Sequence, residues 1–247
     1  MPNYSAIRNS LDEILESIED IKNELPDDDE EDEVEEASET HNTFYLSLSE
    51  LDAIVRHAGG LTSKLFKPND VIVAPPFKWR VIAVGADNPL NCPKEEQHVT
   101  LQVLGYITDG TPFDDAGHND WAKSSMRKYL EDVFLKKLLP ADAACVKYVE
   151  KLTGEAGNKT VDRVFLLSAK ELGFDVKEAG SVYPLFTGYS ASEHRLYKDD
   201  EGDNRWYFTR SPIPGYATNV RRVNTDGSLS YGDASSGYGA VPACIVI

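Results

Sequence analysis

A block of acidic residues divides this chain and limits how it can fold. Nine of the ten residues from 27 to 36 are Asp or Glu. Such a block repels itself, stays solvated and cannot be packed into a hydrophobic core. We therefore expect three parts: an N-terminal helical segment (residues 1–26), an acidic linker (27–42) and a globular domain (43–247).

The net charge is concentrated in the same region. Of the 42 acidic and 25 basic residues in the chain, the first 40 positions hold 16 and 2, which leaves 26 and 23 for the remainder. The globular part is therefore close to neutral. Nucleic-acid binding requires clustered basic residues that neutralise phosphates, so we expect no nucleic-acid partner.

The N-terminal segment carries a heptad pattern of apolar residues, at alternating steps of four and three. A repeat of 3.5 residues buries a narrow stripe against copies of the same helix. Leu or Ile at position a with Ile at d disfavours two-stranded coils, so we predict a homotrimer, with a tetramer as the alternative. A helix packed on its own domain is the competing interpretation. The predicted oligomerisation residues are Ile7, Leu11, Ile14, Ile18, Ile21 and Leu25.

Targeting signals and cysteine pairs are not indicated. No apolar run approaches the roughly 18 residues of a membrane span, and the first residues lack the basic start and apolar core of a signal peptide. We expect a protein made in the cytoplasm of its host, without a membrane span. Cys92, Cys145 and Cys244 are widely spaced and predict neither a disulfide framework nor a metal site; we interpret them as small buried hydrophobes.

Periodicity predicts helices mainly in the first half of the globular part and irregular strands in the second, an α+β order. A capping box at Ser47 starts one helix, which ends at Gly59-Gly60, and Pro140 ends another. Ser168 and Glu171 form a second predicted capping box. The expected helices cover residues 47–59, 124–139 and about 144–152. The expected strands lie near 71–84 (interrupted by Pro75-Pro76), 98–107, 164–167, 205–210, 217–223, 229–232 and 241–247.

The stretch RWYFTRSPIPG (205–215) places Trp206, Phe208 and Arg210 on one face of a strand. An arginine beside large apolar rings is costly unless carboxylate or carbonyl groups satisfy its guanidinium. We interpret Arg210 as a buried residue that fixes the positions of loops. The alternative is an anion-binding guanidinium in a pocket.

Several motifs carry a resemblance to a known family. They are Trp206-x-x-x-Arg210-Ser-Pro, an Asp-Gly turn, a closing Pro242-Ala243, and the runs Trp121…Ser125-Met-Arg127-Lys-Tyr-Leu130…Phe134 and Val164-Phe-Leu-Leu-Ser168. Over about residues 70–247 the chain resembles an uncharacterised domain family of gut bacteria and their phages. Family members carry Arg before the final Pro-Ala, whereas Val241 stands here.

The resemblance implies a C-type-lectin-like head, of the type found in the formylglycine-generating enzyme and in phage variable proteins. It implies that some residues hold the fold together, namely Trp121, Arg127, Trp206, Arg210 and Pro242. The copper-binding cysteine pair of a formylglycine-type oxidase is not indicated by the spacing of Cys92, Cys145 and Cys244.

The motifs of common hydrolases, proteases and nucleotide-binding enzymes are absent from the sequence. We expect no catalytic site and no cofactor; the alternative is an enzyme of unrecognised type that uses Arg210 with Asp226 or Asp233. Two acidic loops, 114–120 and 199–204, are interpreted as solvated loops, with calcium binding as the alternative.

Tyrosines recur amid Ser, Gly, Asn and Arg in the last third of the chain, a composition typical of recognition loops. We expect a phage virion or surface-display protein whose multimeric head binds a host surface glycan or protein, beside other virion proteins. A purely structural decoration protein is the alternative. The candidate ligand-binding residues are Tyr189, Arg195, Tyr197, Tyr216, Asn219, Arg221, Asn224, Tyr231 and Tyr238.

Overall fold

The computed structural model describes residues 41–93, 96–105, 111–199, 201–237 and 239–247. The heptad positions, the acidic block and Tyr238 lie outside these ranges. The globular unit runs from His41 to Ile247. It begins two residues earlier than expected because Asn42 is tied to the body: its backbone N–H and its side-chain amide both donate to Asp70 Oδ1, at 3.0 and 3.2 Å.

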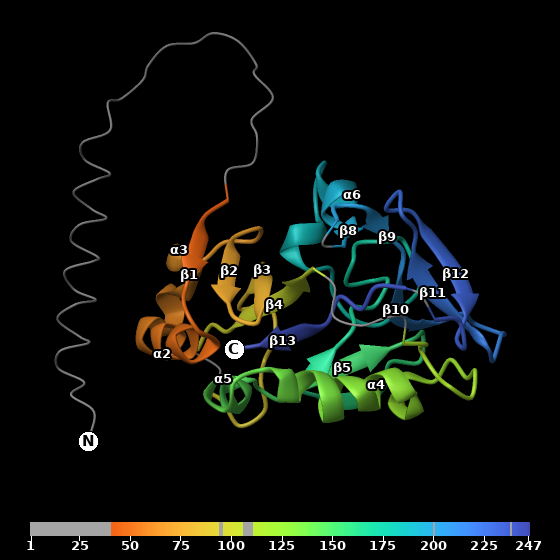
Figure 1. The fold of residues 1–247 in the computed structure, drawn as a ribbon, viewed down its shortest axis with the longest axis horizontal. Coiled ribbons are helices and arrows are strands. Elements are labelled where there is room, and N and C mark those ends of the chain that lie inside the picture. Colours follow the sequence, from red (N-terminus) through yellow and green to blue (C-terminus); the bar gives the residue numbers. More distant parts are fainter. Residues whose placement is uncertain (1–40, 94–95, 106–110, 200, 238) are drawn as a thin grey trace, which may run out of the picture. The chain divides into compact units, whose positions relative to one another are not determined.

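A six-stranded sheet forms the centre of the body (Figure 1), and the C-terminal strand lies inside it. β13 pairs antiparallel with both β4 and β7, while β1 and β2 form a parallel pair. In spatial order the strands are β1 (Thr43–Tyr45), β2 (Val71–Ala74), β3 (Phe77–Val84), β4 (Val99–Leu104), β13 (Cys244–Val246) and β7 (Val164–Phe165). The predicted break at Pro75-Pro76 is confirmed as the turn between β2 and β3.

Helix α2 (Leu48–Ala58) begins and ends where the capping box and the Gly pair predict. Ser47 and Glu50 exchange both bonds of the capping box, and Gly59 is the C-cap. A 3₁₀ turn (Gly59–Leu61) and α3 (Thr62–Leu65) follow. The backbone N–H of Ser49 donates to Asp142 Oδ1 at 2.9 Å, which fastens α2 to α5 (Pro140–Cys145).

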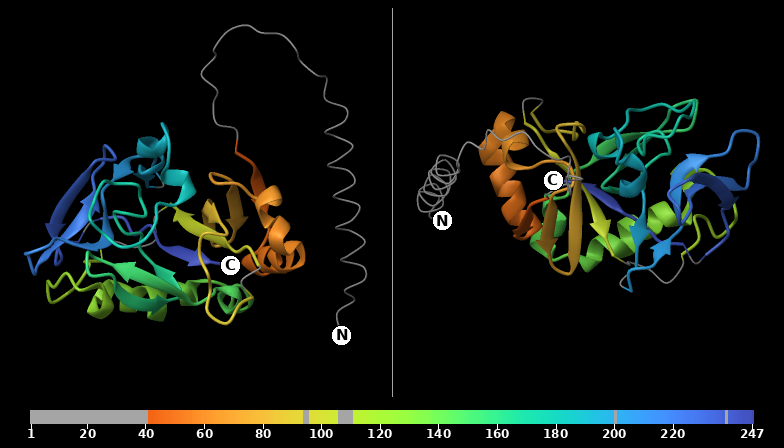
Figure 2. Two further views of the ribbon diagram at one scale, coloured as in Figure 1. Left: turned by 180° about the vertical axis from the view of Figure 1, so that it is seen from behind. Right: turned by 90° about the horizontal axis from the view of Figure 1, so that it is seen from above.

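The predicted helix over 124–139 is present as a run of different helical turns. A 3₁₀ turn (Trp121–Lys123) precedes α4 (Ser125–Tyr129), a π-helical turn (Leu130–Phe134) and another 3₁₀ turn (Leu135–Lys137). Pro140 ends this run and also starts α5, a position where its missing N–H costs nothing. Figures 1 and 2 show α4 along one side of the body.

The third helix expected at 144–152 is wrong. Val149–Thr153 is strand β5, which pairs antiparallel with β6 (Asn158–Asp162). Its burial alternates, with Val149, Lys151 and Thr153 inside, which is the two-residue period of a strand. Apolar helix formers at Ala143 and Ala144 concealed that period.

A second sheet holds the predicted strands of the C-terminal third: β10 (Tyr207–Pro212), β11 (Asn219–Val223) and β12 (Leu229–Asp233). The register of β10 against β11 shifts between Phe208 and Pro212, and within this bulge the Arg210 N–H donates to Leu167 O. Short elements complete the region: η5 (Pro184–Phe186), α6 (Ala191–His194), β8 (Tyr197–Lys198) and β9 (Asn204–Arg205).

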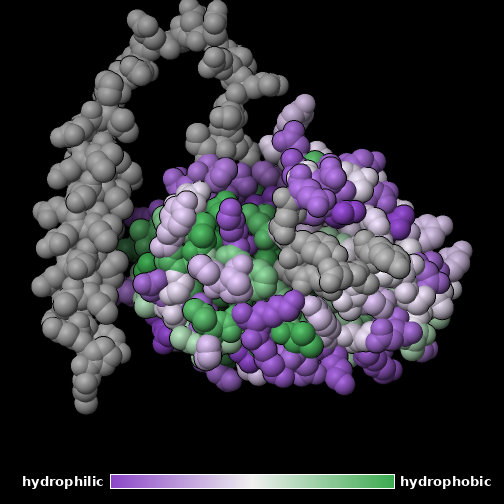
Figure 3. All heavy atoms as spheres, in the orientation of Figure 1, coloured by the Kyte–Doolittle hydropathy of each residue, from purple (hydrophilic) through white to green (hydrophobic). Residues whose placement is uncertain are grey.

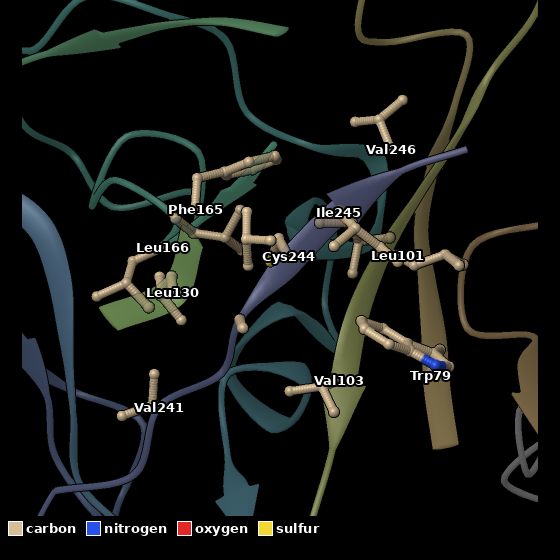
Figure 4. Packing of buried hydrophobic residues seen from close by; sticks show 14 of the residues in the cluster. Trp79, Leu101, Val103, Leu130, Phe165, Leu166, Val241, Cys244, Ile245 and Val246 are labelled. Atoms are coloured by element: carbon tan, nitrogen blue, oxygen red, sulfur yellow. The ribbon is translucent and has the colours of Figure 1, made fainter. Parts of the chain in front are cut away.

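One continuous apolar core joins the two halves of the body. Around β13, the side chains of Cys244 and Ile245 lie among Leu101, Phe165 and Leu130 (Figure 4). The fold is mixed α+β, as the order of elements predicts, with sheets more extensive than helices. No helix within the described ranges is both long and apolar enough for a membrane span.

Candidate ligand-binding groove

Three adjoining hollows follow the β5–β6 hairpin, and neighbouring hollows share residues of their walls. The first, of about 490 Å³, shares Ala122 with the second, of about 130 Å³. The second shares Asn158 and Pro212 with the third, of about 220 Å³. We refer to these three hollows as the hairpin groove.

One end of the hairpin groove lies between the α4 region and β6. Its charged side chains are Lys123, Arg127, Lys128, Glu131, Asp132 and Asp162, and half-exposed Tyr148 supplies an aromatic ring. The cations and carboxylates here are equal in number. The site therefore carries little net charge but many hydrogen-bonding groups.

Asp162 holds this end in shape. It accepts from Arg127 Nε at 2.5 Å, from Trp121 Nε1 at 3.2 Å and from Thr160 Oγ1 at 2.6 Å. Arg127 also donates to the carbonyl of Val161, on the hairpin. Trp121 and Arg127, which the resemblance assigns to the frame, thus fasten the helical run to β6, and Arg127 also forms part of the groove wall.

The other end of the groove is built from the β10–β12 sheet and the segment around residue 178. Lys177, Glu178, Glu155 and Arg221 line it. Arg221 Nε lies 3.4 Å from Glu178 Oε1, while Glu178 Oε2 accepts from Ser211 Oγ at 2.6 Å. Positive and negative groups are again equal in number at this end.

Asn119, in the middle of the groove, connects it to the turn that precedes β11. Its side-chain amide donates to the carbonyls of Tyr216 and Asn219. Tyr216 is 64% exposed. Tyr231, 61% exposed, stands directly across the ladder from Arg221, so its side chain is on the same face of the sheet.

The structure therefore divides the predicted ligand-binding residues into separate groups. Arg221 lines one end of the groove and Tyr231 stands beside it, whereas Tyr216 and Asn219 border the middle through Asn119. Asn224 and Tyr189 lie near α6 instead, since Gly227, in the turn after Asn224, approaches the Ser192 carbonyl. Tyr189 is fully exposed.

Two predicted ligand-binding residues are held by contacts within the body: Tyr197 is buried and Arg195 is half-buried. Tyr197 is 4% exposed, and its hydroxyl donates to the carbonyl of Gly105. Arg195 stacks on Phe174 at 4.2 Å and donates to the carbonyls of Leu172 and Gly173. The expectation that they stand free in recognition loops is corrected, because both are used to close loops onto the core.

Arg210 is 1% exposed and does not line the groove. Its guanidinium donates to both carboxylate oxygens of Glu171 and to the carbonyls of Leu166 and Leu152. Glu171 belongs to the predicted capping box with Ser168, which is present. Arg210 thereby ties β10 to the segments that carry residues 152, 166 and 171.

A second charged group continues this buried network. Lys151 Nζ contacts Asp87 Oδ1 at 2.5 Å and lies 3.7 Å from Glu171 Oε1. Tyr183 and Thr100 donate to Asp87 Oδ2 at 2.7 and 2.6 Å. Burial tends to raise the pKa of Asp87, but Lys151 and these hydrogen bonds hold it below its ordinary value.

The remaining predicted frame residues are also packed inside. Trp206 lies partly buried, edge-on to Phe208 at 5.1 Å and with the Arg222 guanidinium 5.1 Å from its ring. Pro242 is buried, and its carbonyl accepts a weak bond from the Cys244 thiol.

The acidic residues named in the enzyme and calcium-binding alternatives accept hydrogen bonds within their own turns. Asp226 accepts from Ser228 and Asp233 from Ser235, each through backbone and hydroxyl bonds. The carboxylate that pairs with Arg210 is Glu171, so the Arg–Asp pair of the enzyme alternative is not formed. In the acidic loops, Asp114 accepts from the backbone of His118 and Ser125, and Asp199 from Glu201, Asp203 and Arg205.

Sequence reasoning missed Tyr148, Asn158 and Lys177 as groove residues. The sequence predicts a helix around Tyr148, and Asn158 is the first residue of β6, a strand that the sequence does not predict. On the face drawn in Figure 3, hydrophobic residues show mainly in the left half, and the coloured residues of the right half are mostly pale or hydrophilic. The period-two pattern of 149–153 was the signal that would have revealed the hairpin.

Comparison with known proteins gives one match. A family model described as a domain of unknown function (DUF6273) covers residues 99–247. No curated protein and no solved structure matches significantly. The matched range begins at β4 and contains every residue of the hairpin groove.

Proposed function

The chain belongs to the DUF6273 family, and from this premise we propose that its globular body is a non-catalytic recognition head. The ligand that suits the hairpin groove is a neutral polar polymer, of which a glycan chain is the best example. The observation that carries this proposal is the row of three adjoining hollows, with cations and carboxylates equal in number at both ends.

The charge balance sets the class of ligand. A site for a polyanion gathers Lys and Arg without matching carboxylates. Here Lys123, Arg127 and Lys128 face three carboxylates at one end, and Lys177 and Arg221 face two at the other. Side chains of both signs, with Asn119 and Asn158 between them, offer donors and acceptors to hydroxyl groups along a chain.

Tyrosines at both ends support the same ligand class. Tyr148 lines one end, Tyr231 stands beside Arg221 at the other, and Tyr216 borders the middle through Asn119; all three are at least half exposed. A tyrosine offers a rigid apolar face with a hydroxyl tip and loses little conformational entropy on binding. Such rings suit the flat, partly apolar faces of sugar rings.

The setting that we propose is a phage virion or another displayed surface. The head has a C-type-lectin-like architecture in this proposal, the heptad segment assembles a homotrimer (or tetramer), and the acidic linker spaces the heads from other virion proteins. The support is the heptad pattern, the acidic block and the resemblance of the motifs. Several heads together would raise a weak single-site affinity through avidity.

The test is binding of the full chain to an array of bacterial surface glycans. We expect Tyr148→Ala and Tyr231→Ala each to weaken binding at least fivefold without lowering the melting temperature. Tyr45→Ala is the matched control, since Tyr45 is 82% exposed on the edge strand β1, outside the groove.

Other outcomes separate the alternatives. Binding that survives both groove substitutions contradicts the assignment of the site. Binding to host protein and not to glycan shows a protein ligand. A folded chain that binds neither is explained better as a structural decoration protein.

A further inference from the structure

The loop between β3 and β4 brings together three side chains with the chemistry of metal ligands. They are Cys92, Glu96 and His98, and none of them lines the hairpin groove. One ligand atom from each, a sulfur, a carboxylate oxygen and an imidazole nitrogen, lies within 4.8 Å of the other two.

His98 is the unusual member of this cluster. It is 1% exposed, and within the described residues neither ring nitrogen has a hydrogen-bond partner at normal distance, although the backbone of Ile247 is close enough to interact with the ring. A buried imidazole normally pairs with a protein group or with water, because leaving it unpaired is unfavourable. Its Nε2 lies 3.7 Å from Glu96 Oε2, close enough for one ion to bind both.

The backbone fixes the positions from which these side chains reach one another. His98 immediately precedes β4, and its carbonyl accepts from the N–H of Gly85, at the end of β3, at 2.8 Å. Asn91, in the left-handed conformation (φ 63°), turns the chain just before Cys92. The Glu96 N–H donates to the carbonyl of Pro93 at 3.2 Å.

We propose that Cys92, Glu96 and His98 bind a divalent transition metal of the zinc class. Thiolate, imidazole and carboxylate are all zinc ligands, and in a tetrahedral site the nitrogen and oxygen ligands lie about 3.4 Å apart. The thiolate and the carboxylate together neutralise a dication. The softness of the thiolate favours zinc over calcium or magnesium.

The half-buried positions of Cys92 and Glu96 define the kind of site. They leave one side of the cluster open to solvent, so that three protein ligands and one water or external ligand complete the tetrahedron. The bound metal links Cys92 and Glu96, in the β3–β4 loop, to His98, which immediately precedes β4. The short spacing Cys-x₃-Glu-x-His differs from the paired-cysteine patterns that identify zinc sites in sequences, which is why the sequence predicted no metal site.

The experiment uses the full chain, stripped of metal with a chelator and then titrated with Co²⁺ under reducing conditions. We expect one equivalent to bind with a thiolate-to-cobalt charge-transfer band, and equimolar Zn²⁺ to abolish that band and raise the melting temperature. The acidic block can attract Co²⁺ but has no thiolate, so the band reports this site alone.

Matched variants locate the ligands. Cys92→Ser should remove the charge-transfer band, and Glu96→Gln should weaken Co²⁺ binding at least tenfold, whereas Cys145→Ser, which changes another half-buried free thiol, should leave both unchanged. No band in the parent chain, or a band that persists in Cys92→Ser, overturns the proposal. The test uses Cys92 and Glu96 because both are half-buried, whereas a substitution of buried His98 could prevent folding.

Discussion

Arg210 and Glu171 form a two-point ion pair inside the body, with Nη1–Oε2 and Nη2–Oε1 distances of 2.5 and 2.7 Å. Burial opposes the charge on each partner, but the pairing outweighs it: the pKa of Glu171 is lowered, and that of Arg210 is raised. Because Glu171 also caps the turn that starts at Ser168, one pair fixes β10, β5 and the segment after β7 relative to one another.

Arg210→Ala should lower the free energy of unfolding by about 3–5 kcal/mol, because Glu171 is left charged and buried without its main partner. Arg210→Lys should also be destabilising, since a lysine cannot reproduce the two-point geometry. Chemical denaturation of the purified variants measures both. The double variant Arg210→Met, Glu171→Gln should recover part of the loss; a double variant no better than Arg210→Ala would contradict this account.

Acid should destabilise the protein through Asp87. Its folded pKa is lowered, with Lys151 overcoming the opposing effect of burial, so its contribution is complete above the ordinary pKa of Asp, about 3.9. That contribution is lost as the pH falls below this value toward the folded pKa. Melting curves from pH 7 to pH 2.5 should show the decline.

Asp87→Asn isolates this effect from other carboxylates, since the pKa values of partly buried Asp199 and of exposed Asp226 and Asp233 are lowered too. The variant should be less stable than the parent at pH 7. The difference should shrink as the pH falls, because the parent then protonates Asp87 as well. A constant difference across the range would exclude Asp87 as the titrating group.

Gly173 should be intolerant of any side chain. Its φ is 78°, and a Cβ would lie 2.4 Å from the Phe186 carbonyl oxygen, which is backbone and cannot move aside cheaply. Gly173→Ala should therefore cost clearly more than the roughly 1–2 kcal/mol of the left-handed conformation alone. Gly202→Ala is the matched control, with φ 89° and open space around its Cβ; equal losses of stability in thermal melts would argue against the close approach.

Local signals in the sequence predicted much of the frame. The capping boxes at Ser47 and Ser168 and the break at Pro75-Pro76 were predicted because their chemistry is contained within four residues. The hairpin of β5 and β6 was missed, since Val149–Thr153 follows a helix directly and its pairing partner lies beyond a turn.

The sites depended on contacts that a sequence does not display. Tyr197 stands in a charged stretch that predicts exposure, yet it is buried and its hydroxyl donates to the Gly105 carbonyl 92 positions away, whereas Tyr216 is exposed. Cys92, Glu96 and His98 are near in sequence, but their convergence depends on the turn at Asn91 and on the pairing of His98 with Gly85.

The heptad segment predicts a trimer or tetramer of the full chain, measurable by light scattering at micromolar concentration. Ile14→Asn and Ile18→Asn should each dissociate it, because every copy would bury an unpaired amide in the seam. Ser10→Asn, outside the a and d positions, is the control and should leave the mass unchanged. A monomeric parent chain would remove the multimeric display from the proposed function.

Binding in the hairpin groove should depend only weakly on salt. A polyanionic ligand releases counterions when it binds, so its affinity falls steeply between about 50 and 200 mM salt. Five cations and six carboxylates line the groove, and a neutral glycan has no charge for the salt to screen. Titrations of the full chain at both salt concentrations should therefore give affinities within about twofold of each other. In the Lys177→Ala variant the affinity should likewise change little with salt concentration. A tenfold loss of affinity of the parent chain at high salt would identify an anionic ligand instead.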